Sequence, residues 1–215
     1  MFIGHFGVGF GAKKADTRVS LGTYIMASQF IDLLWPIFLL LKLEAVQIDP
    51  GNTVVTPLNF IYYPFSHSML GVLFWALLFG GVYYIIKKNL KGSLILGALV
   101  FSHWLLDLLT HAPDLPLSPW SDLKMGFGLW NSFLGTVLVE VLIFGLGVYF
   151  LTTTLRFNKL KGKLALWSLI GFLSLIYVMN LFGPPPPSVE PIGYIGLAQW
   201  IFVAWGYWID KLAVK

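Results

Sequence analysis

Long apolar runs separated by polar, proline-rich or lysine-rich segments dominate the chain. A helix needs about 20 mostly apolar residues to cross a bilayer. By this criterion the sequence predicts six spans, over residues 20–41, 66–86, 93–111, 132–155, 164–182 and 194–212. Pro36 lies inside the first of these spans and predicts a kink there.

Residues 1–12 are also apolar, and they are rich in glycine. They are too few to cross a membrane as a helix, so we expect a short re-entrant or buried helix. No internal repeat or linker divides the chain. The pattern therefore predicts an all-α, polytopic membrane bundle of about six transmembrane helices plus this short helix, in one domain over residues 1–215.

The composition supports a membrane location. The chain is 57% hydrophobic and only 11% charged, whereas a soluble domain has about 25% charged residues. Its first cations, Lys13 and Lys14, follow the apolar start instead of preceding it, which is not the order of a cleavable signal peptide. Cysteine is absent from the sequence, so a metal site would have to use histidine, aspartate or glutamate.

The cations cluster in alternate connections. Apart from Lys42, which directly follows the first span, the connections at 42–65, 112–130 and 183–193 contain one cation, Lys124, among several acids. Positively charged connections remain in the cytoplasm, so we predict that both termini are cytoplasmic. The net charge of +4 is then explained by topology and not by nucleic-acid binding. The clusters are Lys13/Lys14/Arg18, Lys87/Lys88/Lys91, Arg156 to Lys163 and Lys211/Lys215.

Three potential metal ligands, His103, Asp107 and His111, recur at every fourth residue of one predicted span, so they share a helix face. Ionisable groups within a membrane usually mark a functional site. At 1.5 Å per residue, Asp32 lies at about the same depth as His103 and Asp107. We therefore expect all four histidines, with His5 and His67 at the extremes of depth, to converge with the two aspartates in the middle-to-outer half of the bundle.

Some of these residues have alternative explanations. His111 lies at the predicted membrane boundary, where it is either a further ligand or a hydrogen-bonded interface group. Asp32 alone could serve helix packing or a proton relay. Glu140 could be a ligand or general base, but we favour a buried, protonated glutamate bonded to a neighbouring helix. An i, i+4 pair such as His103 and Asp107 has no comparable structural explanation, and we interpret it as part of a metal site.

The sequence resembles that of the membrane-bound metal-dependent hydrolases, a family of bacterial and archaeal inner-membrane proteins. The resemblance lies in the order of Gly4-His5, Asp32, His67-Ser68 and His103-x-x-x-Asp107, followed by Thr110 and PLSPW at 116–120. The resemblance covers about residues 1–125 and leaves 126–215 as additional spans. That family is similar, distantly, to the zinc-dependent phospholipase C and single-strand nuclease superfamily.

The resemblance implies a ligand set. Asp32, His67, His103 and Asp107 would hold one zinc ion, and His5 would share Asp107 to hold a second. Several residues precede His5, so we do not expect an N-terminal amine ligand. The sequence has no later His-x-x-x-Asp pair, which argues against a third metal. Imidazole and carboxylate ligands suit zinc, and manganese or iron would also fit.

The implied function is hydrolysis by a metal-activated water, with Asp107 and Asp32 as catalytic residues. In a bilayer the natural substrates are phosphoesters of phospholipids, although an acyl ester or amide would also suit the chemistry. One alternative is a transporter in which His/Asp groups relay metal ions or protons toward Lys87–Lys91. Only Ser93 and Ser102 are polar between 92 and 102, which argues against that path. Another alternative is a structural metal site, which would be closed to further ligands.

Overall fold

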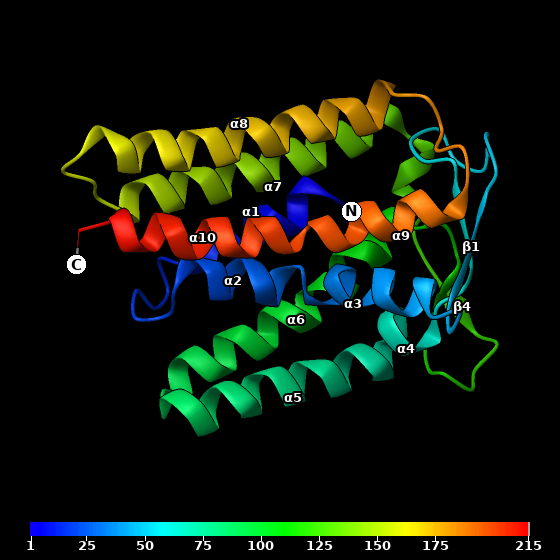
Figure 1. Cartoon of the computed structure of the whole chain (residues 1–215). Coiled ribbons are helices and arrows are strands. Elements are labelled where there is room, and N and C mark those ends of the chain that lie inside the picture. The colour runs from blue at the N-terminus through cyan, green and yellow to red at the C-terminus, as the bar shows by residue number, and fades with distance from the viewer. Residues whose placement is uncertain (215) are drawn as a thin grey trace.

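Long apolar helices run side by side through the computed structural model, which describes residues 1–214 (Figure 1). Five helices or helix pairs in this range are long and apolar enough to cross a membrane, or six if the bent pair near residue 29 forms one span. The predicted polytopic all-α bundle is confirmed. The five are α5 Met69–Lys87, α6 Leu90–Thr110, α7 Phe133–Thr154, α8 Leu160–Phe182, and α9 Val189–Ala198 with α10 Trp200–Leu212.

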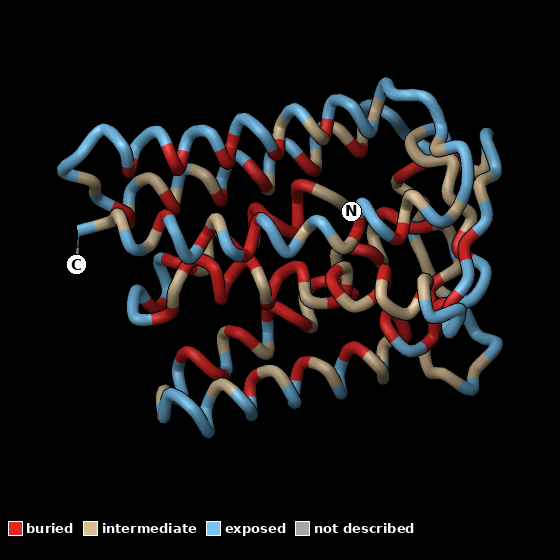
Figure 2. Tube along the Cα trace, in the orientation of Figure 1, coloured by how far each residue is buried: buried red, intermediate tan, exposed pale blue. Residues whose placement is uncertain are grey.

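The short N-terminal helix, α1 Ile3–Ala12, lies in the middle of the bundle, as predicted. Figure 2 shows buried residues along its path, while α5 and α8 at the periphery are largely exposed. Glycines allow α1 to approach α7 backbone to backbone. A Cβ added at Gly7 would lie 2.6 Å from the carbonyl oxygen of Ile143, and one added at Gly147 would overlap the carbonyl group of Gly7.

We expect Gly147→Ala to destabilise the protein, because the new methyl group would force α1 away from α7. Overpacking of this kind typically costs about 1–3 kcal/mol, which would be visible as a lower midpoint of thermal unfolding in detergent. Gly145→Ala is the matched control on the same helix, since nothing lies within 4 Å of its added Cβ. Equal melting temperatures for the two variants would show that the close α1–α7 contact does not form.

The first predicted span is divided into α2 Leu21–Ser28 and α3 Phe30–Leu40, which meet at 56°. The predicted kink at Pro36 is wrong, because Pro36 lies within α3 and the chain bends at Gln29 instead. The break has a tertiary cause. At the break, the carbonyl oxygen of Ser28 lies 2.9 Å from Nδ1 of His103 and accepts a hydrogen bond from this side chain of α6.

The second predicted span is also interrupted. His67 ends a separate short helix, α4 Pro64–His67, and does not lie in the first turn of the span. Ser68 then caps α5 by accepting a hydrogen bond from the backbone N–H of Gly71 at 3.1 Å. His111 lies just beyond α6 in extended backbone, although its N–H still donates to the carbonyl oxygen of Asp107 at 2.8 Å.

Small β elements, not predicted from the sequence, cover one end of the bundle (Figure 1). The connections rich in lysine and arginine gather at the opposite end, on one side of the bundle as expected. The elements are an antiparallel pair of β1 Ala45–Ile48 and β2 Leu58–Tyr62, a second pair of β3 Leu115–Pro116 and β4 Lys124–Met125, and the 3-10 turn η1 Leu129–Asn131.

Buried apolar side chains form two clusters. One joins α1, α2, α7, α8 and α10 around residues such as Phe6, Leu169 and Phe202. The other joins α2, α3, α5 and α6 around residues such as Ile31 and Leu96. The predicted polar residues are held between these two clusters, where α1, α3, α4 and α6 meet.

Candidate metal centre

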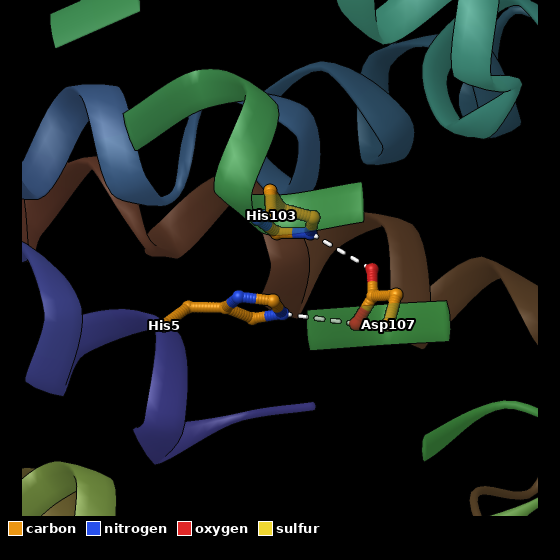
Figure 3. Close-up of side chains that lie close together, drawn as sticks. All are labelled: His5, His103 and Asp107. Carbon is orange, nitrogen blue, oxygen red and sulfur yellow. Dashed lines mark hydrogen bonds and ion pairs between the residues drawn. The ribbon is translucent and has the colours of Figure 1, made fainter. Parts of the chain in front are cut away.

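Asp107 of α6 lies at the centre of the polar residues. Its Oδ1 lies 3.0 Å from Nε2 of His5, and its Oδ2 lies 3.1 Å from Nε2 of His103 (Figure 3). All three residues are about 1% exposed. The imidazole rings of His5 and His103 stack, with centroids 3.6 Å apart and planes 5° apart. Asp107 thus joins α6 to the buried helix α1.

A second group of ligand atoms adjoins the first. Oδ1 of Asp32 lies 3.6 Å from Nε2 of His67 and 3.6 Å from Nε2 of His103. Nε2 of His67 also lies 3.8 Å from Oδ2 of Asp107, and Nε2 of His111 lies 4.0 Å from Oδ1 of Asp107. The structure therefore brings together all six residues proposed as ligands, including His5 and His67 from the extremes of predicted depth.

The histidine rings are oriented for metal binding. Nδ1 of His103 faces a carbonyl oxygen, that of Ser28, which can only accept a hydrogen bond. Nδ1 of His67 lies 2.7 Å from Oγ of Ser66, whose hydroxyl donates to Oε2 of Glu44 at 2.6 Å. In the neutral form, both rings consequently carry their proton on Nδ1 and present the Nε2 lone pair to the cluster.

A cation fits this arrangement. Nε2 of His103 is buried and has no hydrogen-bond partner among residues 1–214. Lone pairs from His103 and His67 converge on carboxylate oxygens of Asp32 and Asp107, an arrangement of acceptors that repel one another unless a positive charge lies between them. Hydrogen bonding of the other ring nitrogen to a fixed acceptor is the usual support for a metal-binding histidine.

Glu44, in the connection after α3, supports His67 from outside the cluster. It is 3% exposed, and its Oε1 accepts hydrogen bonds from the backbone N–H groups of Phe65 and Ser66, both at 2.8 Å. Burial raises the pKa of the Glu44 carboxyl, although these hydrogen bonds and nearby His67 act in the opposite direction. Glu44 thereby fixes the backbone of α4 and the hydroxyl that orients His67.

We expect Ser66→Ala to weaken metal binding by about 10- to 100-fold, because His67 would lose the acceptor for Nδ1–H. Ser68→Ala is the matched control two residues away. It removes the cap of α5, which should lower stability by about 1 kcal/mol and leave metal affinity unchanged. Competition with a chromophoric zinc chelator would measure both affinities. Equal affinity in the two variants would show that Ser66 does not orient His67.

His111 has a similar support. Its Nδ1 lies 2.9 Å from Oδ1 of Asp114, which also accepts a hydrogen bond from the hydroxyl of Tyr63. Burial, together with the Asp114 carboxylate, raises the pKa of Tyr63 well above its usual value. His111 is therefore hydrogen-bonded on one side and directed toward Asp107 on the other. Sequence reasoning missed Asp114, for which the one signal is its i, i+3 spacing from His111.

The α-amine of Met1 lies inside the cluster, contrary to our expectation. It donates to Oδ1 of Asp107 at 2.7 Å and is fully buried. Glu140 of α7 holds this segment in place, since its Oε2 accepts from the backbone N–H groups of Phe2 at 2.9 Å and Gly4 at 3.2 Å. Glu140 is 2% exposed and bonds to a neighbouring helix, as predicted.

The cluster opens onto a cavity of about 770 Å³. Asp32 is its most accessible acid, with 23% of its side chain exposed, compared with 2% for Asp107. Residues of α3, α8, α9 and α10 and the β1–β2 connection form the other walls. The cluster is thus accessible to a small molecule or part of a lipid. Its members that line the cavity are Met1, Asp32, His67, Asp107 and His111.

The fold and the site define a multi-pass helical membrane protein with a buried His/Asp cluster beside a cavity. The model of the YdjM inner membrane protein family matches residues 48–184, and the chain belongs to this family. No curated protein and no solved structure matches the chain. The matched region contains His67, His103, Asp107 and His111 and extends beyond residue 125, so the family includes spans that the sequence resemblance had left aside.

Proposed function

We propose that this protein is a membrane-embedded, metal-dependent hydrolase of phosphoester bonds, with phospholipids as its substrate class. One observation carries the proposal. Imidazole Nε2 atoms converge on the carboxylates of Asp32 and Asp107 at the wall of a cavity inside a membrane bundle. Such a donor set suits zinc, and manganese or iron would also fit.

The residues divide into two cation positions. Asp32, His67 and His103, with Oδ2 of Asp107, would hold the first ion. His5 and Oδ1 of Asp107 would hold the second, next to the α-amine of Met1. Two zinc ions would supply Lewis acidity at the phosphoryl oxygens and would make a water molecule more acidic.

The remaining chemistry belongs to the side chains. Asp107 would offer one carboxylate oxygen to each position. Asp32, which lines the cavity and is partly exposed, is suited to take a proton from the attacking water through its carboxylate. The apolar side chains of α8 to α10 that line the cavity, such as Phe172 and Phe202, would exclude bulk water from the reacting phosphoester.

The transporter alternative has less support. It requires a polar path from the cluster toward Lys87–Lys91, and the two hydroxyls along this part of α6 are bonded to backbone carbonyls. Ser93 donates to Gly80 at 2.7 Å, and Ser102 donates to Leu99 at 2.7 Å. A purely structural metal site also has less support, because the cavity leaves the cluster open to a further ligand.

The positive-inside rule supports an orientation for the site. We place the lysine-rich end of the bundle, with the C-terminus, in the cytoplasm, and the end covered by β1 to β4 outside. The N-terminal amine, which the sequence predicted to be cytoplasmic, lies instead inside the bundle beside Asp107. The cavity is lined by the β1–β2 connection and by the segment between α8 and α9. In this orientation the cluster and its cavity lie toward the outer half of the membrane, within reach of lipid headgroups.

The test is release of headgroup or diacylglycerol from vesicles of phosphatidylglycerol and phosphatidylethanolamine by the purified protein. We expect turnover that is abolished by a chelator and restored by zinc. Metal-loaded protein that cleaves neither lipid would contradict the proposal, as would cleavage that is insensitive to chelation. Metal uptake by proteoliposomes without lipid cleavage would support the transporter instead.

A further inference from the structure

Three buried polar groups at the cavity have no hydrogen-bond partner within residues 1–214. They are the hydroxyl of Tyr177 on α8, Oε1 of Gln199 between α9 and α10, and Nε1 of Trp35 on α3. Tyr177 is 6% and Trp35 is 8% exposed, so bulk water is largely excluded from both side chains. Buried polar groups are nearly always paired in folded proteins, and these three share a cavity, which indicates that a ligand pairs them.

The residues that carry the three groups lie on different elements that line the cavity beside the cluster. Trp35 lies on α3, one turn after Asp32, and its ring meets that of His67 edge to face with centroids 6.4 Å apart. Tyr177 and Gln199 belong to the helices on the other walls of the cavity. A molecule whose phosphoester reaches Asp32 and Asp107 would therefore extend its remaining polar part along these walls.

The charge of the cavity limits what that part can be. No lysine or arginine side chain lines it among residues 1–214, whereas Asp32, Asp107 and Glu140 do. Bound cations and the Met1 amine would balance one phosphoryl group at the cluster. A second phosphate farther into the cavity would find no cationic side chain, so a neutral or positively charged group is favoured there.

We propose that Trp35, Tyr177 and Gln199 form a headgroup subsite for a phosphodiester lipid that carries hydroxyl or amino groups. The proposal rests on the phosphoester hydrolase function and specifies its substrate. Oε1 of Gln199 accepts a hydrogen bond from a hydroxyl or ammonium group, the Tyr177 hydroxyl donates or accepts one, and Nε1–H of Trp35 donates to an oxygen. Phosphomonoester and diphosphate lipids lack the matching headgroup and are discriminated against.

The test measures binding, so that it does not depend on turnover. Native mass spectrometry of metal-loaded protein in detergent would compare short-chain phosphatidylglycerol, phosphatidic acid and an isoprenoid diphosphate. We expect phosphatidylglycerol to bind most tightly. Tyr177→Phe and Gln199→Leu should each weaken its binding about tenfold, as expected for one lost hydrogen bond in a buried site, and leave binding of phosphatidic acid unchanged. Tyr194→Phe, at an exposed tyrosine of α9, is the control and should change neither.

Two outcomes would overturn the subsite: tighter binding of the diphosphate, or variants that weaken all three lipids equally. Its failure is distinguishable from failure of the hydrolase proposal. If the protein selects phosphatidylglycerol through Tyr177 and Gln199 but cleaves no lipid, the subsite is supported and the hydrolase function is refuted. If it cleaves lipids with no dependence on Tyr177 or Gln199, the hydrolase function is supported and the subsite is refuted.

Discussion

Asp107→Asn is expected to reduce bound metal from two equivalents to fewer than about 0.1 and to reduce lipid turnover to background. Asp107 is the one side chain whose oxygens face both proposed cation positions, with Oδ1 near His5 and Oδ2 near His103. Asparagine has nearly the same shape but no charge, and neutral amides are weak ligands for zinc beside carboxylates and imidazoles. Metal content would be measured by inductively coupled plasma mass spectrometry.

Asp122→Asn provides the matched control, because Asp122 is an exposed carboxylate in the connection after α6. It should retain full metal content and turnover. Size-exclusion chromatography and circular dichroism would establish that the Asp107→Asn protein keeps its helical fold. A folded Asp107→Asn protein that still binds two metal ions would exclude Asp107 as the bridge between them.

His67→Ala and His5→Ala are expected to remove one metal ion each, and different ones. His67 belongs only to the group with Asp32 and His103, whereas His5 belongs only to the group with His103 and Asp107. His103→Ala should remove the first ion, as His67→Ala does, because Nδ1 of His103 is bonded to the Ser28 carbonyl and only Nε2 is free to bind a metal. Native mass spectrometry would distinguish proteins with two, one and no ions.

Either single-ion variant should also lose most of its turnover. A bound cation contributes several kcal/mol to stabilising charge in the transition state, and each 1.36 kcal/mol corresponds to a factor of ten in rate. The expected loss in kcat is therefore at least about 10³-fold. Two variants that both retain two ions, or that both lose two, would refute the division into separate positions.

The long spans could be predicted from the sequence because their length and apolar character are local properties. The breaks within them could not, because their causes are tertiary. The chain bends at Gln29, where the Ser28 carbonyl serves His103, a residue 75 positions away. Pro36, the local signal, has no such effect within α3. The β elements were missed because their strands are short and lie in connections rich in proline, glycine and polar residues, which predict loops.

The sequence predicted which residues gather at the candidate site, but it did not predict the side chains that support them. The spacing of His103 and Asp107 placed both on one helix face, and the order of the other polar residues suggested the partners. Glu44 and Ser66 are 22 positions apart in the sequence, and the fold of the connection between them brings them into contact. Helical periodicity cannot predict such a contact. The Met1 amine reaches Asp107 because α1 turns the N-terminal residues into the bundle.

Metal content of the wild-type protein tests the proposed centre most directly. The protein would be purified in detergent without chelators, and its metals would be quantified per chain before and after incubation with zinc. We predict two equivalents of zinc, manganese or iron in total, held through dialysis and removed by a strong chelator. A folded protein that carries no metal and takes up none from excess zinc would contradict both the metal centre and the hydrolase function proposed from it.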